Sequence, residues 1–344
     1  MRSGGVARSG QRLFRSLRAS GRRVHLLGCD RALFPGDVRH GEAVTWLGLS
    51  EGPNRMEEWV QSAGRIALEM QPDLVVGYYG SSAGWVAVQV ANMCHAPSVV
   101  ALRGNDVDRD LEQVGRRDMV LEALHHAHAL TTVSTEMKHK VMPLTAAPVT
   151  FIANTVDTSQ FRRDEEGAQN LRSTLQLERP VVGVFGVFKE KRGLDFLKEV
   201  APETLGYEVL LVGTVRDEVR PDVASTWREL SYLKDASELC AAYSLCDVVV
   251  QPSHADGFPN VVLEAMASKV PVMARPVGGL RDAITHGQNG WLFENADAWR
   301  SHLSAVTADT LRRVGEHALS TLQPMGVESA AFDEVFTSVL GKRA

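Results

Sequence analysis

Short apolar segments alternate with helix-like segments along almost the whole chain, and they do so in two successive series. Between the strand-like segments lie stretches such as 54–70, where apolar residues recur at the spacing of an amphipathic helix. The strand-like segments of the first series are 24–28, 73–79, 98–104, 129–134 and 149–155. Short apolar strands that alternate with helices predict a parallel sheet covered on both faces.

A second series of the same kind follows a polar segment at 162–170, which we interpret as a linker. Its strand-like segments are 181–188, 207–213, 247–253 and 270–276. A chain of 344 residues is also too long for one small core and suits two domains of roughly 150 residues each. We therefore predict two α/β domains of nucleotide-binding type, at 1–160 and 161–325, followed by an amphipathic helix within 326–344.

Composition excludes several classes of protein. The net charge of −5 gives no reason to expect a nucleic-acid partner. No apolar run approaches the roughly 18 residues of a membrane span. The four cysteines lie far apart without metal-type spacing, which favours free thiols in a reducing compartment and hence a cytoplasmic protein.

The first 29 residues contain seven arginines and no acid. This pattern fits a solvated helix face, a patch that contacts a membrane surface, or an organelle transit peptide. The segment runs directly into the strand-like 24–28, which favours the first two interpretations. Peripheral contact with the inner face of the membrane is therefore one of our expectations.

The segment HADGFPNVVLEAMASKVPVMARPVGG, residues 254–279, places Asp256 and Glu264 on either side of a predicted helix start. The N–H groups of Gly257, Phe258 and the residues after Pro259 would form an anion site there. Two acids beside a phosphate repel it unless they face hydroxyl groups. A nucleotide-sugar, with phosphate between two hydroxylated rings, satisfies both requirements. The alternative is an ordinary helix whose early acids complement its dipole.

This segment resembles the donor-binding signature of glycosyltransferase family four, whose members are retaining enzymes of the GT-B fold. The matching elements are Pro-Ser at 252–253, Gly-Phe-Pro at 257–259, Glu-Ala-Met-Ala at 264–267 and Gly-Gly at 278–279. The resemblance implies two doubly wound, Rossmann-like domains that face each other across a cleft, with the C-terminal helix packed back on the N-terminal domain. It implies no obligatory metal and no cofactor besides a donor sugar on UDP or GDP.

Further site residues follow from the same resemblance. The segment 186–197 is similar to the basic element that neutralises the donor diphosphate, and Lys189 and Arg192 lie nearest its basic positions, with Lys191 as a rival. The segment 3–10 resembles the glycine loop that approaches the donor phosphates through Gly4 and Gly5. The segment 151–161 looks like the family's interdomain segment, and the stretch at 232–233, including Leu233, would border the base.

Three features depart from the family pattern. Asp256 stands where glutamate is usual and reaches one methylene less far. Arg103 stands where many relatives carry histidine; it could contact phosphate, as one of the donor-binding residues, or a carboxylate acceptor, but it cannot act as a base. The apolar strand that normally leads into the glycine loop is missing before Gly4, so we expect that the natural chain starts upstream or that its N-terminal domain is weakened.

Two sequence patterns resemble metal-binding motifs, but neither predicts a metal site. Asp106-Val107-Asp108 matches the Asp-x-Asp of metal-dependent transferases with another fold, but the two α/β series argue against that fold. His125, His126 and His128 lie in a predicted helix without an acid or cysteine at ligand spacing. We predict no metal site.

The sequence thus predicts retaining transfer of a sugar from a nucleotide-diphosphate sugar to a hydroxyl acceptor, which can be a glycan, a lipid or a small molecule. The family resemblance, and not these residues, implies that the diphosphate itself deprotonates the acceptor on the front face. The alternative is a catalytically silent GT-B subunit, which Arg103, Asp256 and the missing strand favour and Glu264 disfavours. A sugar-nucleotide epimerase or a phosphorylase of similar architecture has no motif in its support.

Overall fold

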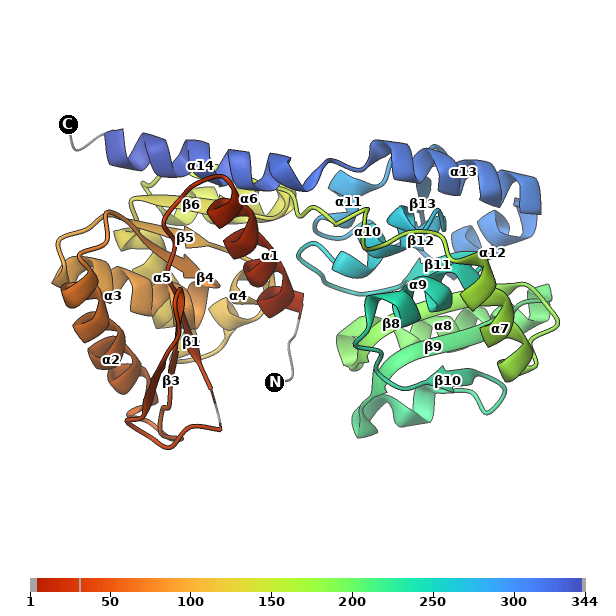
Figure 1. The fold of residues 1–344 in the computed structure, drawn as a ribbon. Coiled ribbons are helices and arrows are strands. Elements are labelled where there is room, and N and C mark those ends of the chain that lie inside the picture. Colours follow the sequence, from red (N-terminus) through yellow and green to blue (C-terminus); the bar gives the residue numbers. More distant parts are fainter. Residues whose placement is uncertain (1–4, 31, 342–344) are drawn as a thin grey trace. The chain divides into compact units, whose positions relative to one another are not determined.

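The computed structural model describes residues 5–30 and 32–341, and these form two compact units (Figure 1). Unit 1 contains the residues up to Asn154 and those from Gly326 onward. Unit 2 is the continuous segment Thr155–Met325. The chain therefore passes from unit 1 to unit 2 after Asn154 and returns to unit 1 at Gly326.

The described residues of unit 1 contain two small sheets. One has the order β1-β3-β2, in which β2 is antiparallel to β3. The other has the order β4-β5-β6-β7 and is parallel throughout. The strands of the first sheet are β1 (Leu26–Cys29), β2 (Val38–His40) and β3 (Val44–Leu47). Those of the second are β4 (Val75–Tyr78), β5 (Ser98–Ala101), β6 (Ala129–Thr132) and β7 (Val149–Phe151).

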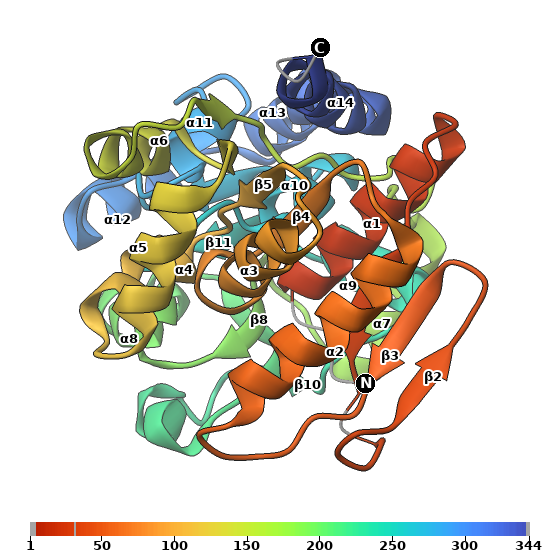
Figure 2. The same ribbon diagram turned by 90° about the vertical axis from the view of Figure 1, so that its left-hand side faces the viewer.

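Helices cover these sheets. Helices α2 and α3 lie side by side and share one apolar cluster with β1, β3 and β4 (Figure 2). The helices of unit 1 are α1 (Gly5–Ala19), α2 (Arg55–Met70), α3 (Trp85–Met93), α4 (Asn105–Asp108), α5 (Arg116–His126), α6 (Thr135–Val141) and α14 (Met325–Gly341), with short turns η1 (Gly80–Gly84), η2 (Asp110–Glu112) and η3 (Met142–Leu144).

Helix α1 is part of the core of unit 1. Its residues Leu13 and Leu17, one turn apart, pack with residues of β5 and β6 and with Phe332 and Phe336 of α14. The arginines of this segment contribute as well, because Arg12 pairs with Glu328 at 2.9 Å. The arginine-rich opening of the sequence is therefore explained in part by contacts with a helix more than 300 residues away.

Unit 2 is built on one parallel sheet of six strands in the order β10-β9-β8-β11-β12-β13. The strands are β8 (Val181–Phe188), β9 (Glu208–Val215), β10 (Arg228–Leu230), β11 (Val248–Gln251), β12 (Val272–Ala274) and β13 (Gly290–Leu292). Buried valines, leucines and aromatic residues of these strands form its main core with α8 and α12. Both units are thus α/β structures whose sheets are parallel apart from the short strand β2, and the fold class predicted from the sequence is confirmed.

The helices of unit 2 correct one prediction. The polar segment 162–170 is not a linker, because most of it lies in α7, where the Asp164 side chain caps the helix by accepting from the N–H of Gly167 at 2.9 Å. The helices are α7 (Glu165–Leu175), α8 (Leu194–Val200), α9 (Ala236–Leu245), α10 (Asn260–Ala267), α11 (Leu280–Ala283), α12 (Ala296–Ala305) and α13 (Ala308–Thr321), with turns η4 (Glu190–Arg192), η5 (Pro202–Leu205) and η6 (Asp217–Asp222).

Candidate functional site

The candidate donor site lies at the carboxyl edge of the unit 2 sheet. The chain builds β8, β9 and β10 outward in one direction and then returns to place β11 on the other side of β8. Between β8 and β11 the strand order reverses, and in open α/β sheets this is where ligands bind. The loop after β8 contains the predicted basic residues. The loop after β11 contains Asp256 and leads into α10, which contains Glu264.

Arg192 and Asp256 meet at this point. Arg192 Nη1 lies 2.7 Å from Asp256 Oδ2, and both side chains are largely buried, with 20% and 14% of their surfaces exposed. Gln251, the last residue of β11, donates from Nε2 to Ser253 Oγ at 2.9 Å and to Asp256 Oδ2 at 3.3 Å. The pair of charges is therefore partly shielded from water, which strengthens its attraction.

The two loops are also joined through their backbones. The N–H of His254 donates to the carbonyl of Lys191 at 2.9 Å, and the N–H of Arg192 donates to that of Lys189 at 2.7 Å. Gly193 has a positive φ of 72°, and a Cβ there would lie 2.2 Å from the carbonyl oxygen of Pro252. Only glycine permits this close approach. Lys189 and Lys191 are thus held on the same loop as Arg192, at the same edge of the sheet.

The start of α10 is buried. Gly257, Phe258 and Pro259 are all buried, Pro259 occupies the cap position, and the helix proper begins at Asn260. The carbonyl of Gly257 accepts from the N–H of Gly279 at 2.6 Å. The double glycine of the signature therefore packs directly against the turn that leads into the helix.

Glu264 lies one turn into α10, and the residue is only 5% exposed. It accepts a hydrogen bond from the hydroxyl of Tyr243 at 2.8 Å, and the Tyr243 ring stacks on Phe185 with centroids 4.1 Å apart. A stacked, fully buried tyrosine holds the carboxylate in one orientation. Leu233, which we expected to border the base, lies in the loop after β10, at the same edge of the sheet.

The remaining predicted residues belong to unit 1. Gly4 lies outside the described residues, and Gly5 is the first residue of α1. Arg103 follows β5, and its Nη2 donates to Ser9 Oγ at 3.3 Å and to Asn154 Oδ1. Its guanidinium lies over the ring of Tyr78, 4.4 Å from the centroid. Arg103 is thereby fixed between α1 and the carboxyl ends of β4 and β7.

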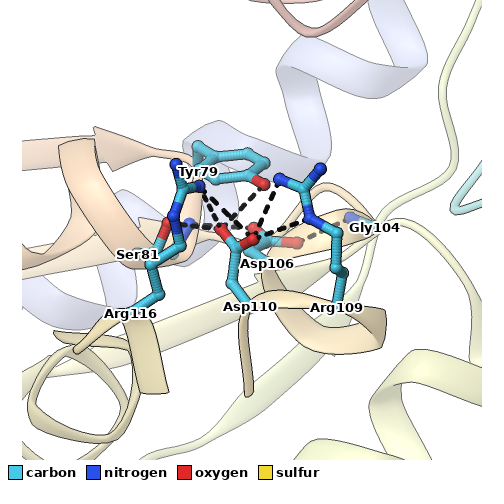
Figure 3. A network of polar contacts seen from close by, with 8 residues as sticks. Tyr79, Ser81, Gly104, Asp106, Arg109, Asp110 and Arg116 are labelled. Atoms are coloured by element: carbon cyan, nitrogen blue, oxygen red, sulfur yellow. Dashed lines mark hydrogen bonds and ion pairs between the residues drawn. The ribbon is translucent and has the colours of Figure 1, made fainter. Parts of the chain in front are cut away.

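A polar network surrounds the buried acids Asp106 and Asp110 (Figure 3). Asp106 is fully buried and accepts from the N–H groups of Gly80, Arg103 and Gly104 at 2.7–2.8 Å. Burial raises the pKa of the Asp106 carboxyl, against the effect of these hydrogen bonds. The Asp106-x-Asp108 motif thus supplies a carboxylate that holds backbone amides in place. In the described residues, no group of three or more His, Cys, Asp or Glu side chains is placed to hold a metal ion.

Asp110 is the second buried acid of this network. It accepts from the hydroxyls of Ser81 at 2.6 Å and Tyr79 at 3.0 Å, and Arg109 and Arg116 pair with it (Figure 3). Tyr79 has φ 116° and ψ 130°, a conformation that is strained for any residue other than glycine. Strain of this kind persists where surrounding contacts enforce it, and often near functional sites.

The sequence did not indicate Gln251, Tyr243 or Ser9 as site residues. An amide at the end of the apolar run VVVQ was the available signal for Gln251, because a buried amide requires partners. Tyr243 contacts Glu264, and Ser9 contacts Arg103, only through the tertiary fold. No local sequence pattern indicated either residue. Among the described residues, no helix is both long and apolar enough to cross a bilayer.

Two family models match the sequence. Residues 3–160 match the model described as Glycosyltransferase Family 4, and residues 179–309 match the model described as Glycosyl transferases group 1. A D-inositol 3-phosphate glycosyltransferase of Nocardia farcinica is 26% identical over 284 residues, which is 72% of this chain and 62% of the relative. The matched part thus spans less than two thirds of that relative's length.

Solved structures show the same fold. The sucrose-phosphate synthase of Thermosynechococcus elongatus superposes with a TM-score of 0.84 at 18% identity, covering 99% of this chain and 94% of that one. HepE of Anabaena, solved with UDP and glucose, superposes with a TM-score of 0.79 at 18% identity, covering 97% of this chain and 96% of that one. At these identities the likeness concerns the fold.

Proposed function

The chain belongs to the glycosyltransferases of family 4 and group 1, and we propose that it moves a sugar from a nucleotide-diphosphate sugar to a hydroxyl group of an acceptor. One observation carries this proposal: at the strand-order reversal of unit 2, the basic loop after β8 and the acidic loop after β11 are joined, with Arg192 2.7 Å from Asp256. The family matches favour this activity over a catalytically silent subunit.

The basic loop suits the leaving group. A departing nucleoside diphosphate gains negative charge as its bond to the sugar breaks, so cations fixed beforehand at that position lower the barrier. We assign this role to Arg192 and Lys189, with Lys191 beside them on the same loop. Backbone N–H groups near Gly257–Phe258 would add donors to the phosphates.

The two acids suit the hydroxylated ends of the donor. Asp256 would accept hydrogen bonds from the sugar ring, and Glu264 from the ribose, with Leu233 beside the base. Both carboxylates are already held by neighbours, Asp256 by Arg192 and Gln251 and Glu264 by Tyr243. Preorganised acceptors bind hydroxyls with a smaller loss of conformational freedom.

We further propose that transfer retains the configuration of the sugar and requires no metal. The motif contains no side chain with the arrangement of an activated nucleophile, and cationic residues provide the charge that a metal would otherwise supply. The diphosphate would then remove the acceptor's proton on the face that it leaves.

We place the reaction on the cytoplasmic side of the cell, at the inner membrane face when the acceptor is a lipid. All four cysteines are free, which suits a reducing compartment. Arg15, Arg18 and Arg23 are exposed on or just after α1 and offer positive charge to an anionic lipid surface.

Thermal unfolding with UDP, GDP, ADP and their sugar conjugates tests the donor site. We expect one nucleotide class to raise the melting temperature, since ligand at about 100 times its Kd stabilises the folded state by roughly 2.7 kcal/mol. HepE puts UDP first in the panel. Glu264→Ala should lose the shift, whereas Glu238→Ala, an exposed glutamate of α9, should keep it.

Initial rates of donor hydrolysis, and of transfer to simple sugars and glycolipids, then establish the activity. A protein that none of the nucleotides stabilises would contradict the proposal. A shift of equal size in wild type and Glu264→Ala would contradict the assignment of the site.

A further inference from the structure

Arg103 is a buried cation that forms no ion pair with any acid of the described chain. The residue is only 8% exposed. Its two hydrogen bonds go to neutral groups, Ser9 Oγ and Asn154 Oδ1, and its face lies on the ring of Tyr78. Among residues 5–30 and 32–341, no carboxylate lies within 4.0 Å of its guanidinium nitrogens. A buried charge normally has a counter-ion, because removal from water is costly without one.

The acids in the vicinity are engaged elsewhere. The carboxylate of Asp106 accepts the backbone N–H groups of Gly80, Arg103 and Gly104. Glu328 on α14 pairs with Arg12. The positive charge of the Arg103 side chain is therefore not balanced by an ion pair in the described part of unit 1.

The Arg103 side chain is also held rigidly. Both side-chain hydrogen bonds of Arg103 come from Nη2, so within the described chain Nε and Nη1 have no hydrogen-bond partner. A guanidinium carries five N–H donors in one plane and binds phosphate or carboxylate oxygens in a fixed geometry. Stacking on Tyr78 and the contacts with two segments of unit 1 fix this plane before a ligand arrives.

We propose that Arg103, with Ser9 and Asn154, forms a binding site for a phosphate or carboxylate group of the acceptor. The inference rests on the proposed transferase function and adds that the acceptor is anionic. The donor diphosphate has its own cations in unit 2, where Lys189, Lys191 and Arg192 share one loop. The charge of Arg103 is thus available to the second substrate.

Isothermal titration of the full chain with inorganic phosphate tests the proposal. The titration is done with and without a saturating concentration of the nucleoside diphosphate that stabilises the protein most. We expect phosphate to bind with the nucleotide present, and Arg103→Met to weaken phosphate binding by about 10- to 100-fold, the usual effect of losing charge-assisted hydrogen bonds. Nucleotide affinity should change by less than about 2-fold in that variant.

The control is Arg15→Met, which removes an exposed arginine of α1 and should leave phosphate affinity unchanged. Arg103→Lys keeps a cation at the buried position but loses the planar set of donors, so it should fold and bind phosphate several-fold more weakly. If Arg103→Met does not fold, the phosphate affinity of Arg103→Lys tests the proposal.

Three results would overturn the inference: no phosphate binding by the wild type, phosphate affinity unaffected by both Arg103 substitutions, or a parallel loss of nucleotide affinity. The last would assign Arg103 to the donor diphosphate. Nucleotide binding that depends on Glu264 tests the proposed function separately, so failure of one is distinguishable from failure of the other. In transfer assays, D-glucose 6-phosphate should be preferred to D-glucose by the wild type, and Arg103→Lys should reduce this preference.

Discussion

Asp110 carries a charge in a place without solvent access, and its neighbours determine when that charge is present. Its side chain has no exposed surface. Desolvation alone would raise the pKa of this carboxyl, but hydrogen bonds from Ser81, Arg109 and Tyr79 outweigh it, so the pKa lies below its usual 3.8. A lowered pKa means that the ionised form stabilises the fold above about pH 4, and that this stabilisation is lost as pH falls through the folded-state pKa.

We therefore expect Asp110→Asn to lower the free energy of unfolding by about 2 kcal/mol at pH 7. The loss is smaller than the cost of breaking a fully buried ion pair, because Arg109 and Arg116 are half exposed. The difference from wild type should shrink as pH falls below about 4. Urea unfolding between pH 2.5 and 7 measures it, with Asp118→Asn, an exposed acid of α5, as the control. A difference that is constant over this range would contradict the assignment of the charge.

At the scale of elements, the turn between β11 and α10 depends on a glycine in the loop after β12. Gly278 has φ 51°, and a Cβ there would lie 1.8 Å from the carbonyl oxygen of Asp256. Gly287 has φ 75°, but a Cβ there would meet no atom within 4 Å. The two positions share the left-handed backbone and differ in the space around them.

Gly278→Ala should cost about 2–4 kcal/mol of stability and abolish stabilisation by the nucleotide, because the acidic loop must move away from the new methyl group. Gly287→Ala should cost about 1 kcal/mol, the strain of alanine in a left-handed conformation, and should leave the nucleotide effect intact. Thermal melts with and without nucleotide measure both. Equal effects of the two substitutions would show that backbone strain and not the close approach is decisive.

Local patterns predicted much of the fold and part of the candidate site. Strand ends and motif spacing are properties of neighbouring residues, so Arg192 and Asp256 could be assigned to adjoining loops of unit 2. The strands β2, β3, β10 and β13 were missed because each has only three or four residues, and β2 and β10 are also largely exposed. The partners of Arg103 were not predictable either, since Ser9 and Asn154 lie 94 and 51 residues away.

At the scale of the molecule, unit 1 depends on a helix that follows unit 2 in sequence. Phe332, Val335, Phe336 and Val339 of α14 are buried in the same cluster as Leu13 of α1. Burial of each such side chain stabilises the fold by about 1.5–3 kcal/mol. The sum over these side chains is comparable with the whole stability of an ordinary domain.

A chain that ends after Met325 should therefore lose the cooperative unfolding of unit 1 and keep nucleotide binding by unit 2. Circular dichroism melts and limited proteolysis, each with and without nucleotide, measure the two effects. A chain that ends after Gly341 keeps α14 and is the matched control. Unchanged unfolding of the shorter chain would mean that α14 contributes little to the core of unit 1.

The order of the segments has a consequence for biosynthesis. Unit 2 is continuous, whereas the core of unit 1 is completed only by α14, which leaves the ribosome after every residue of unit 2. Domains usually fold in the order in which they are translated. Here we expect the reverse, with unit 2 complete on the nascent chain while apolar residues of unit 1 such as Leu13 and Leu17 are not yet covered by α14. Unit 1 is then the part of the nascent polypeptide that most needs a ribosome-associated chaperone.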